Sequence, residues 1–120
     1  MKWIFFLSTA IGLVQSEGTF TATSYMNTPR IGSTATLLPS AKVLIAGGAT
    51  ATAELFDPAS ESFTLTGDMV TPRRFHTATL LPDERVLVVG GFVGDSQNNV
   101  PTATAEIYNP TSEFSRRWTT

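Results

Sequence analysis

A chain of 120 residues, of which 42% are hydrophobic and 15% charged, has the length of one domain and enough apolar residues for a packed core, so it is not a disordered chain. Its formal net charge of −2 provides no basic surface for a nucleic-acid backbone, which disfavours nucleic-acid binding. Because the sequence has no cysteine and one histidine, it excludes disulfides, zinc-thiolate sites and thiolate nucleophiles, and we predict no cofactor.

The N-terminal residues 1–16 differ from the rest of the chain. Lys2 precedes an uncharged, mostly apolar run over residues 3–14. A membrane-spanning helix needs about 20 apolar residues, so this length is typical of a signal peptide, with cleavage after Ser16. The alternatives are a strand or helix of the domain itself, an uncleaved anchor and a truncated start. A cleaved leader predicts a secreted, periplasmic or cell-surface protein without membrane insertion.

A repeat with a period of 43 residues organises the remaining segment, 17–120. The pairs that recur at this offset are 19–21 and 62–64, 29–30 and 72–73, 34–39 and 77–82, and 42–48 and 85–91. The sequence at 52–58 returns nine residues later than this period, at 104–110. The insertion therefore lies within 92–102, and its glycine, asparagine and proline residues indicate a loop.

Each repeat predicts four short antiparallel strands, because β-branched and aliphatic runs alternate with turn residues and helical periodicity is absent. The strands expected in the first repeat are 34–38, 43–46, 53–56 and 62–66. Those expected in the second are 77–81, 86–89, 105–108 and 113–118. One further strand is expected at 19–24. The fold class is thus all-β, with repeats at about 33–66 and 75–118.

Two glycines follow the second strand of each repeat. Paired glycines after an apolar strand indicate positive φ, or an approach of neighbouring backbone too close for a Cβ atom. No phosphate-binding glycine spacing surrounds them, so we interpret them as strand-end geometry.

The order of Pro-Arg, two apolar strands ending in Gly-Gly, and Ala-Glu-Leu/Ile-Phe/Tyr-Asp/Asn-Pro resembles the kelch repeat over residues from about 18 to 118. The second repeat is similar to versions in exported microbial kelch proteins and galactose-oxidase-like propellers. The resemblance implies a partial β-propeller of about two four-stranded blades. The residues that it assigns to the structural repeat motif are Arg30, Gly47, Gly48, Phe56, Arg73, Gly90, Gly91 and Tyr108.

Two blades do not close a ring, since propellers have about 4–8 blades. Three interpretations follow, in order of preference: a fragment of a longer protein, a unit that assembles with other copies, or an open two-blade sandwich. Because a repeat buries its apolar face against neighbours, we expect self-association or contact with further kelch blades.

His76 and the arginines are candidate site residues. Histidine is a copper ligand in galactose-oxidase-like enzymes, but we favour packing and turn hydrogen bonds for His76 and predict no metal site, since no cysteine exists for the crosslinked Tyr–Cys cofactor of that family. Arg73 and Arg74 could bind a carboxylate or sulfate, although interblade hydrogen bonds are the favoured interpretation. Residues 116–118 fit a sugar or peptide site and a solvated basic edge equally well.

The inserted loop is the best recognition candidate, because function concentrates in loops on a rigid scaffold. Its candidate residues are Phe92, Asp95, Gln97, Asn98 and Asn99. Three of these offer oxygen ligands for calcium, but the spacing lacks the EF-hand pattern. We expect a non-enzymatic module that binds a protein or glycan partner. The alternatives are a fragment of a galactose-oxidase-like or glyoxal-oxidase-like copper enzyme, and a structural segment without a ligand.

Overall fold

The computed structural model describes residues 17–94 and 97–111. The expected signal peptide, residues 95–96 of the inserted loop and the last expected strand at 113–118 lie outside the described residues. All regular structure in the described part is β-strand, which confirms the all-β prediction. No helix in this part is long and apolar enough to cross a membrane.

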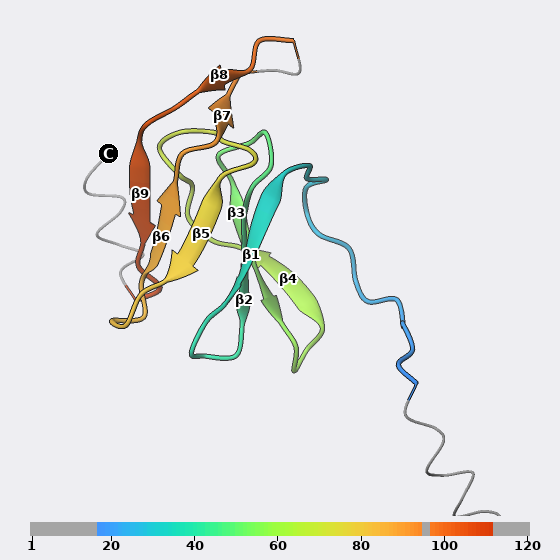
Figure 1. Cartoon of the computed structure of the whole chain (residues 1–120). Coiled ribbons are helices and arrows are strands. Elements are labelled where there is room, and N and C mark those ends of the chain that lie inside the picture. Colours follow the sequence, from blue (N-terminus) through green and yellow to red (C-terminus); the bar gives the residue numbers. More distant parts are fainter. Residues whose placement is uncertain (1–16, 95–96, 112–120) are drawn as a thin grey trace, which may run out of the picture.

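The first repeat forms one four-stranded antiparallel sheet, blade 1 (Figure 1). Its strands are β1 (Ser33–Leu37), β2 (Val43–Gly47), β3 (Ala53–Asp57) and β4 (Ser62–Leu65), in that spatial order. Short turns connect them, and Leu38 N closes the first by donating to Lys42 O over 2.8 Å. Each strand lies within two residues of its predicted bounds.

The second repeat forms blade 2, whose described strands are β5 (Thr77–Leu80), β6 (Val86–Val89) and β9 (Ala105–Tyr108). The inserted residues between β6 and β9 were expected to form only a loop, but they form a hairpin of β7 (Phe92–Val93) and β8 (Val100–Pro101). The hairpin extends beyond the end of blade 2 in Figure 1. Its turn holds the polar residues that suggested a loop.

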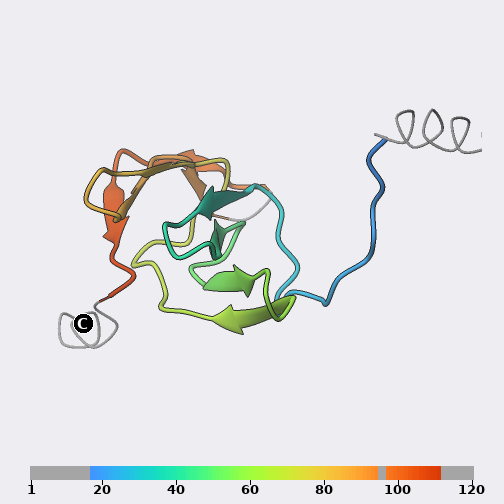
Figure 2. The same ribbon diagram turned by 90° about the horizontal axis from the view of Figure 1, so that it is seen from below.

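The extra strand expected at 19–24 is absent from the structure. These residues are exposed, and Figure 2 shows that the beginning of the described chain extends away from the two sheets. The hydroxyls of Thr23 and Ser24 donate to Glu61 O in the β3–β4 turn, but no strand ladder forms. Residues 19–21 repeat the start of β4, and β4 pairs with the third strand of its own blade. The described residues contain no third strand that precedes residue 19, so the segment has no strand with which to pair.

The core lies between the two blades, which pack face to face with β1 beside β5. Its buried apolar residues are Leu38, Leu44, Ala46, Ala53, Val86 and Val88. On β2, residues 44 and 46 face this core because side chains alternate across a strand, and on β6 residues 86 and 88 do the same. Within residues 17–94 and 97–111, no sheet packs on the blade faces that point away from this junction.

Candidate binding surface at the loop end of the blades

A buried arginine precedes blade 1 and bonds to both the second and the third strand of that blade. The Arg30 guanidinium donates to Gly47 O over 2.8 Å and to Thr52 O over 2.9 Å. It also forms an ion pair of 2.8 Å with Glu54, and neither side chain is exposed. Charge-assisted bonds of this kind are stronger than neutral ones, so Arg30 stabilises the blade from inside.

The same arrangement precedes blade 2. Arg73 donates to Gly90 O and Thr104 O, both over 2.9 Å, and pairs with Glu106 over 2.8 Å. Its guanidinium therefore bonds within its own blade, which corrects the expectation of interblade hydrogen bonds. The contact between blades comes from its carbonyl, which accepts from Gly48 N over 2.9 Å. Since Arg73 is fully buried, it does not reach a ligand in solvent.

Glu54 remains a carboxylate inside the protein. Burial alone raises its pKa, but hydrogen bonds from Asn27 and Arg30 outweigh burial and hold the pKa below the ordinary value of 4.5. The main-chain N–H groups of Asn27 and Thr28 donate to it over 2.8 and 3.2 Å. The segment that enters blade 1 is thus attached to the buried ion pair.

His76 lies in the junction between the blades and is 6% exposed. Its Nε2 is 3.0 Å from the hydroxyl of Thr34 on β1. Burial, and then the positive charge of Arg73, lower the pKa of His76 below its ordinary value of 6.5. The described residues contain no cluster of three His, Asp or Glu side chains around it that could hold a metal. His76 therefore acts as a packing and hydrogen-bonding residue at the junction.

This lowered pKa predicts a pH-dependent stability. A histidine in the unfolded chain takes up a proton near pH 6.5, while His76 in the folded chain resists protonation. The free energy of unfolding is therefore expected to fall as the pH drops below 6.5 towards the folded-state pKa. Urea unfolding at about pH 7.5 and about pH 5.5 measures this change. His76→Gln should show a smaller difference between the two conditions, and an equal difference would contradict the assignment.

All four glycines that end the second strands have positive φ: 74° at Gly47, 93° at Gly48, 69° at Gly90 and 86° at Gly91. Only glycine adopts this region without a steric penalty, which is the backbone requirement that the Gly-Gly pairs indicate.

Phe75 also has positive φ, at 56°, although it is a large aromatic residue. Its counterpart 43 residues earlier is Gly32, with φ of 77°. The Phe75 N–H donates to Gly32 O over 2.8 Å, so the two equivalent turns are adjacent. Phe75 is nevertheless 60% exposed. Sequence reasoning did not single out Phe75, although the glycine at the equivalent position is the signal that could have done so.

The hairpin lies directly beside Phe75. Arg74 and Phe92 form a two-way main-chain bridge, with N···O distances of 3.1 and 2.9 Å. The Arg74 guanidinium also donates to Asn99 Oδ1. The structure therefore brings two of the predicted loop residues, Phe92 and Asn99, together with Phe75.

We call this group the loop-end surface, and its members are Ile31, Arg74, Phe75, Phe92 and Asn99. Ile31 precedes Gly32 and is largely exposed. Of the other predicted loop residues, Gln97 and Asn98 are exposed in the hairpin turn, and Asp95 lies outside the described residues. The predicted third-strand aromatics, Phe56 and Tyr108, lie within the blades and not on this surface.

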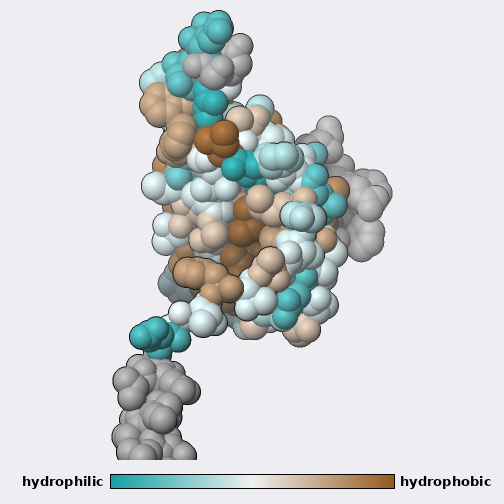
Figure 3. Space-filling view, turned by 90° about the vertical axis from the view of Figure 1, so that its right-hand side faces the viewer, coloured by the Kyte–Doolittle hydropathy of each residue, from teal (hydrophilic) through white to brown (hydrophobic). Residues whose placement is uncertain are grey.

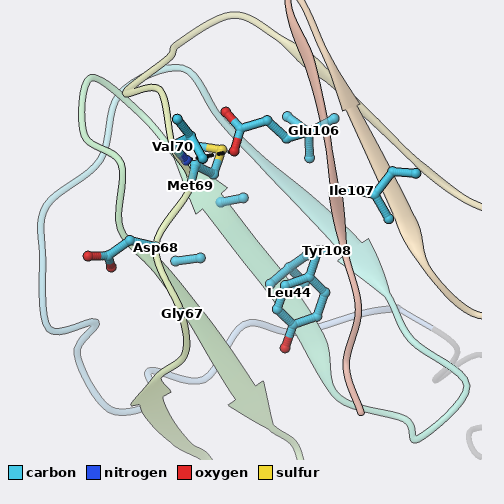
Figure 4. Close-up of a pocket in the computed structure, with 11 residues that line it drawn as sticks. Leu44, Gly67, Asp68, Met69, Val70, Glu106, Ile107 and Tyr108 are labelled. Atoms are coloured by element: carbon cyan, nitrogen blue, oxygen red, sulfur yellow. Dashed lines mark hydrogen bonds between the residues drawn. The ribbon is translucent and has the colours of Figure 1, made fainter. Parts of the chain in front are cut away.

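A cavity of about 390 Å³ lies in the junction between the two blades, on the sides of β2 and β9 that face this junction (Figure 4). Leu44, Met69 and Tyr108 contribute to its walls. Two carboxylate residues line it, Asp68 and Glu106. Glu106 accepts from Val70 N over 2.7 Å, and the Tyr108 hydroxyl is 3.1 Å from the Thr66 hydroxyl. The loop-end surface is the stronger binding candidate because its apolar side chains, among them Ile31 and Phe75, are largely exposed.

Comparison with known proteins agrees with this architecture. Residues 73–120 match the kelch motif, which confirms over the second repeat the resemblance inferred from the sequence. A fungal alcohol oxidase of the AA5 family, solved in complex with copper, has a similar fold, with a TM-score of 0.58 and 20% sequence identity. The similarity covers 68% of this chain and 17% of the oxidase, so this chain spans a small part of that protein's length. The comparison with curated proteins gave no match.

Proposed function

We propose that this chain is an exported, non-enzymatic kelch module that binds a protein or glycan partner through the loop-end surface. Phe75 is the observation that carries this proposal. A positive φ costs a non-glycine residue about 1–2 kcal/mol, and exposure of the ring returns little apolar burial. A strained and exposed aromatic residue is typical of a functional site. Contact with a partner would bury the ring and offset the cost.

The neighbours of Phe75 supply the other groups that a binding site needs. Ile31 and Phe92 extend the apolar surface, while Arg74 and Asn99 present planar polar groups for hydrogen bonds to sugar hydroxyls or peptide amides. Aromatic and arginine side chains dominate the energetics of protein interfaces. The two sheets below these residues form the scaffold that holds the loops in place.

Phe75→Gly tests the proposal because it separates binding from folding. Glycine adopts the required φ without strain, so we expect the free energy of unfolding to stay unchanged or to rise by about 0.5–1 kcal/mol. Binding should weaken at least tenfold, because the central aromatic contact is lost. Urea unfolding measures the first effect, and titration against immobilised panels of oligosaccharides and peptides measures the second.

A second variant and a control complete the test. Replacement of residues 92–101 by a Gly-Asn turn should also abolish binding, whereas Ala59→Lys, in the exposed β3–β4 turn, should leave it unchanged. A wild-type chain that binds no member of either panel, or a Phe75→Gly variant that binds as well as wild type, would contradict the proposal. In the first case the chain would be a structural segment, and in the second its binding site would lie away from Phe75.

The alternative function is a fragment of a galactose-oxidase-like or glyoxal-oxidase-like copper enzyme, and the fold of the copper-containing alcohol oxidase favours it. The residues of this chain do not fit a copper site on their own. The sequence has no cysteine, and its one histidine is buried with Nε2 on Thr34. Copper-dependent oxidation of primary alcohols by this chain would establish the alternative and contradict the non-enzymatic function.

A further inference from the structure

The junction between the blades uses opposite faces of two equivalent sheets. Blade 1 contributes Leu44, Ala46, Ala53 and Leu55, and blade 2 contributes Ala78, Val86, Val88 and Tyr108. At the loop end, the bond from Gly48 N to Arg73 O joins the two blades. The face of blade 2 that packs in the junction is therefore not equivalent, in the repeat, to the face of blade 1 that packs there; it corresponds to the outer face of blade 1.

The outer face of each blade carries the counterparts of the junction residues that the other blade contributes. The outer face of blade 2 carries the counterparts of Leu44, Ala46, Ala53 and Leu55, which are Leu87, Val89, Ala105 and Ile107. The outer face of blade 1 carries the counterparts of Ala78, Leu80, Val86, Val88 and Tyr108, which are Ala35, Leu37, Val43, Ile45 and Phe56. The chain therefore contains both halves of a second interface of the same kind.

Both outer faces are open in the single chain. Ile107 is 48% exposed and Ala105 is exposed, whereas their counterparts Leu55 and Ala53 belong to the core. On blade 1, Leu37 is 64% exposed. Figure 3 shows hydrophobic surface in the middle of the side that faces away from blade 2. Apolar patches of this kind mark interaction surfaces.

The surroundings of two equivalent glycines show where a neighbouring blade fits. A Cβ atom on Gly47 would lie 2.6 Å from Arg73 O and 2.6 Å from the His76 ring, both of which belong to blade 2. A Cβ atom on Gly90 would meet only Thr102 O, at 3.6 Å. The two glycines have the same backbone conformation, with φ of 74° and 69°. Gly90 thus has the same backbone conformation as Gly47, but no neighbouring blade lies against it.

We propose that a second copy of this chain docks the outer face of its blade 1 onto the outer face of blade 2. Gly91 N would donate to Arg30 O of the second copy, as Gly48 N donates to Arg73 O within the chain. The occupant is a second copy because the interface repeats one already present, and the chain carries both complementary faces. The contact is heterologous, so copies add head to tail until a ring closes. Propellers have about 4–8 blades, which two to four copies would supply.

Variants on the two faces test this proposal in the full chain. Leu37→Lys alters the outer face of blade 1, and Ile107→Lys alters that of blade 2. Both positions are exposed in the single chain, so the variants should fold, and circular dichroism checks this. Light scattering should give a discrete oligomer for wild type and for the Ala59→Lys control, and the mass of one chain for each variant.

Mixing the two variants provides the decisive measurement. Each variant retains the face that the other lacks, so an equimolar mixture should form a dimer of one copy of each and nothing larger. Leu65→Lys and Val89→Lys provide a second pair on the same two faces if either first variant fails to fold. A monomeric wild type, oligomers that persist in both variants, or a mixture that stays monomeric would overturn the proposal.

Discussion

Replacement of Arg30 by methionine is expected to lower the free energy of unfolding by about 3–5 kcal/mol. The substitution leaves the Glu54 carboxylate buried without its ion-pair partner. It also removes one donor to Gly47 O and one to Thr52 O, of which Thr52 O keeps its bond from Gly47 N. The stability of an ordinary domain is about 5–15 kcal/mol, so this loss removes a large fraction of the total and should shift the unfolding midpoint to clearly lower urea concentrations. Urea unfolding followed by circular dichroism measures the loss.

The chain offers a matched control for this prediction. Arg85 also pairs with a carboxylate over 2.8 Å, that of Asp83, but both side chains are substantially exposed. Arg85→Met should therefore leave the unfolding curve almost unchanged, because exposed ion pairs contribute little. If Arg30→Met and Arg85→Met lowered the free energy of unfolding equally, the buried ion pair of Arg30 would add no more stability than an exposed one. Arg30 would then contribute through packing, which methionine retains. The double variant Arg30→Met with Glu54→Gln should recover part of the loss, since no carboxylate then remains buried.

Much of the fold is predictable from the sequence because the repeat compares two copies of one unit. Turn residues and apolar residues recur at the same offsets in both repeats, and this pattern predicted seven of the nine described strands, including β3 and β9. The β7–β8 hairpin occurs in only one copy, and its Gly, Asn and Asp residues indicate a loop, so nothing in the pattern predicts it. The strand expected at 19–24 failed for a different reason: a strand needs a partner, which no local pattern provides.

The candidate site was less predictable, since it depends on where loops meet in space. Phe92 and Asn99 were predicted from the insertion, but their neighbour Phe75 lies 17 residues before Phe92 and was not. The destination of the Arg73 guanidinium was also mispredicted, because the sequence does not show whether a side chain bonds to its own blade or to the next. The alignment of Phe75 with Gly32 carries the missing information, since it places an aromatic residue where the backbone favours glycine.

Gly47→Ala is expected to lower the free energy of unfolding by roughly 2–5 kcal/mol. A positive φ costs alanine about 1–2 kcal/mol. The new methyl group would also lie 2.6 Å from the carbonyl oxygen of Arg73. Because this oxygen belongs to the main chain, it can move away only if the junction between the blades shifts. Overpacking of this kind costs about 1–3 kcal/mol. Urea unfolding should show both contributions.

Gly90→Ala separates these two contributions, because it has the same strained φ without the clash in the single chain. Its cost should be limited to about 1–2 kcal/mol, so the difference from Gly47→Ala measures how tightly the blades approach. In an assembly of copies, the Gly90 methyl group would meet the incoming Arg30 carbonyl as the Gly47 methyl group meets that of Arg73. Gly90→Ala should then weaken assembly while leaving the chain folded. If Gly47→Ala and Gly90→Ala destabilise the isolated chain equally, the close approach at Gly47 has no energetic weight, and the glycines are required for their φ angles alone.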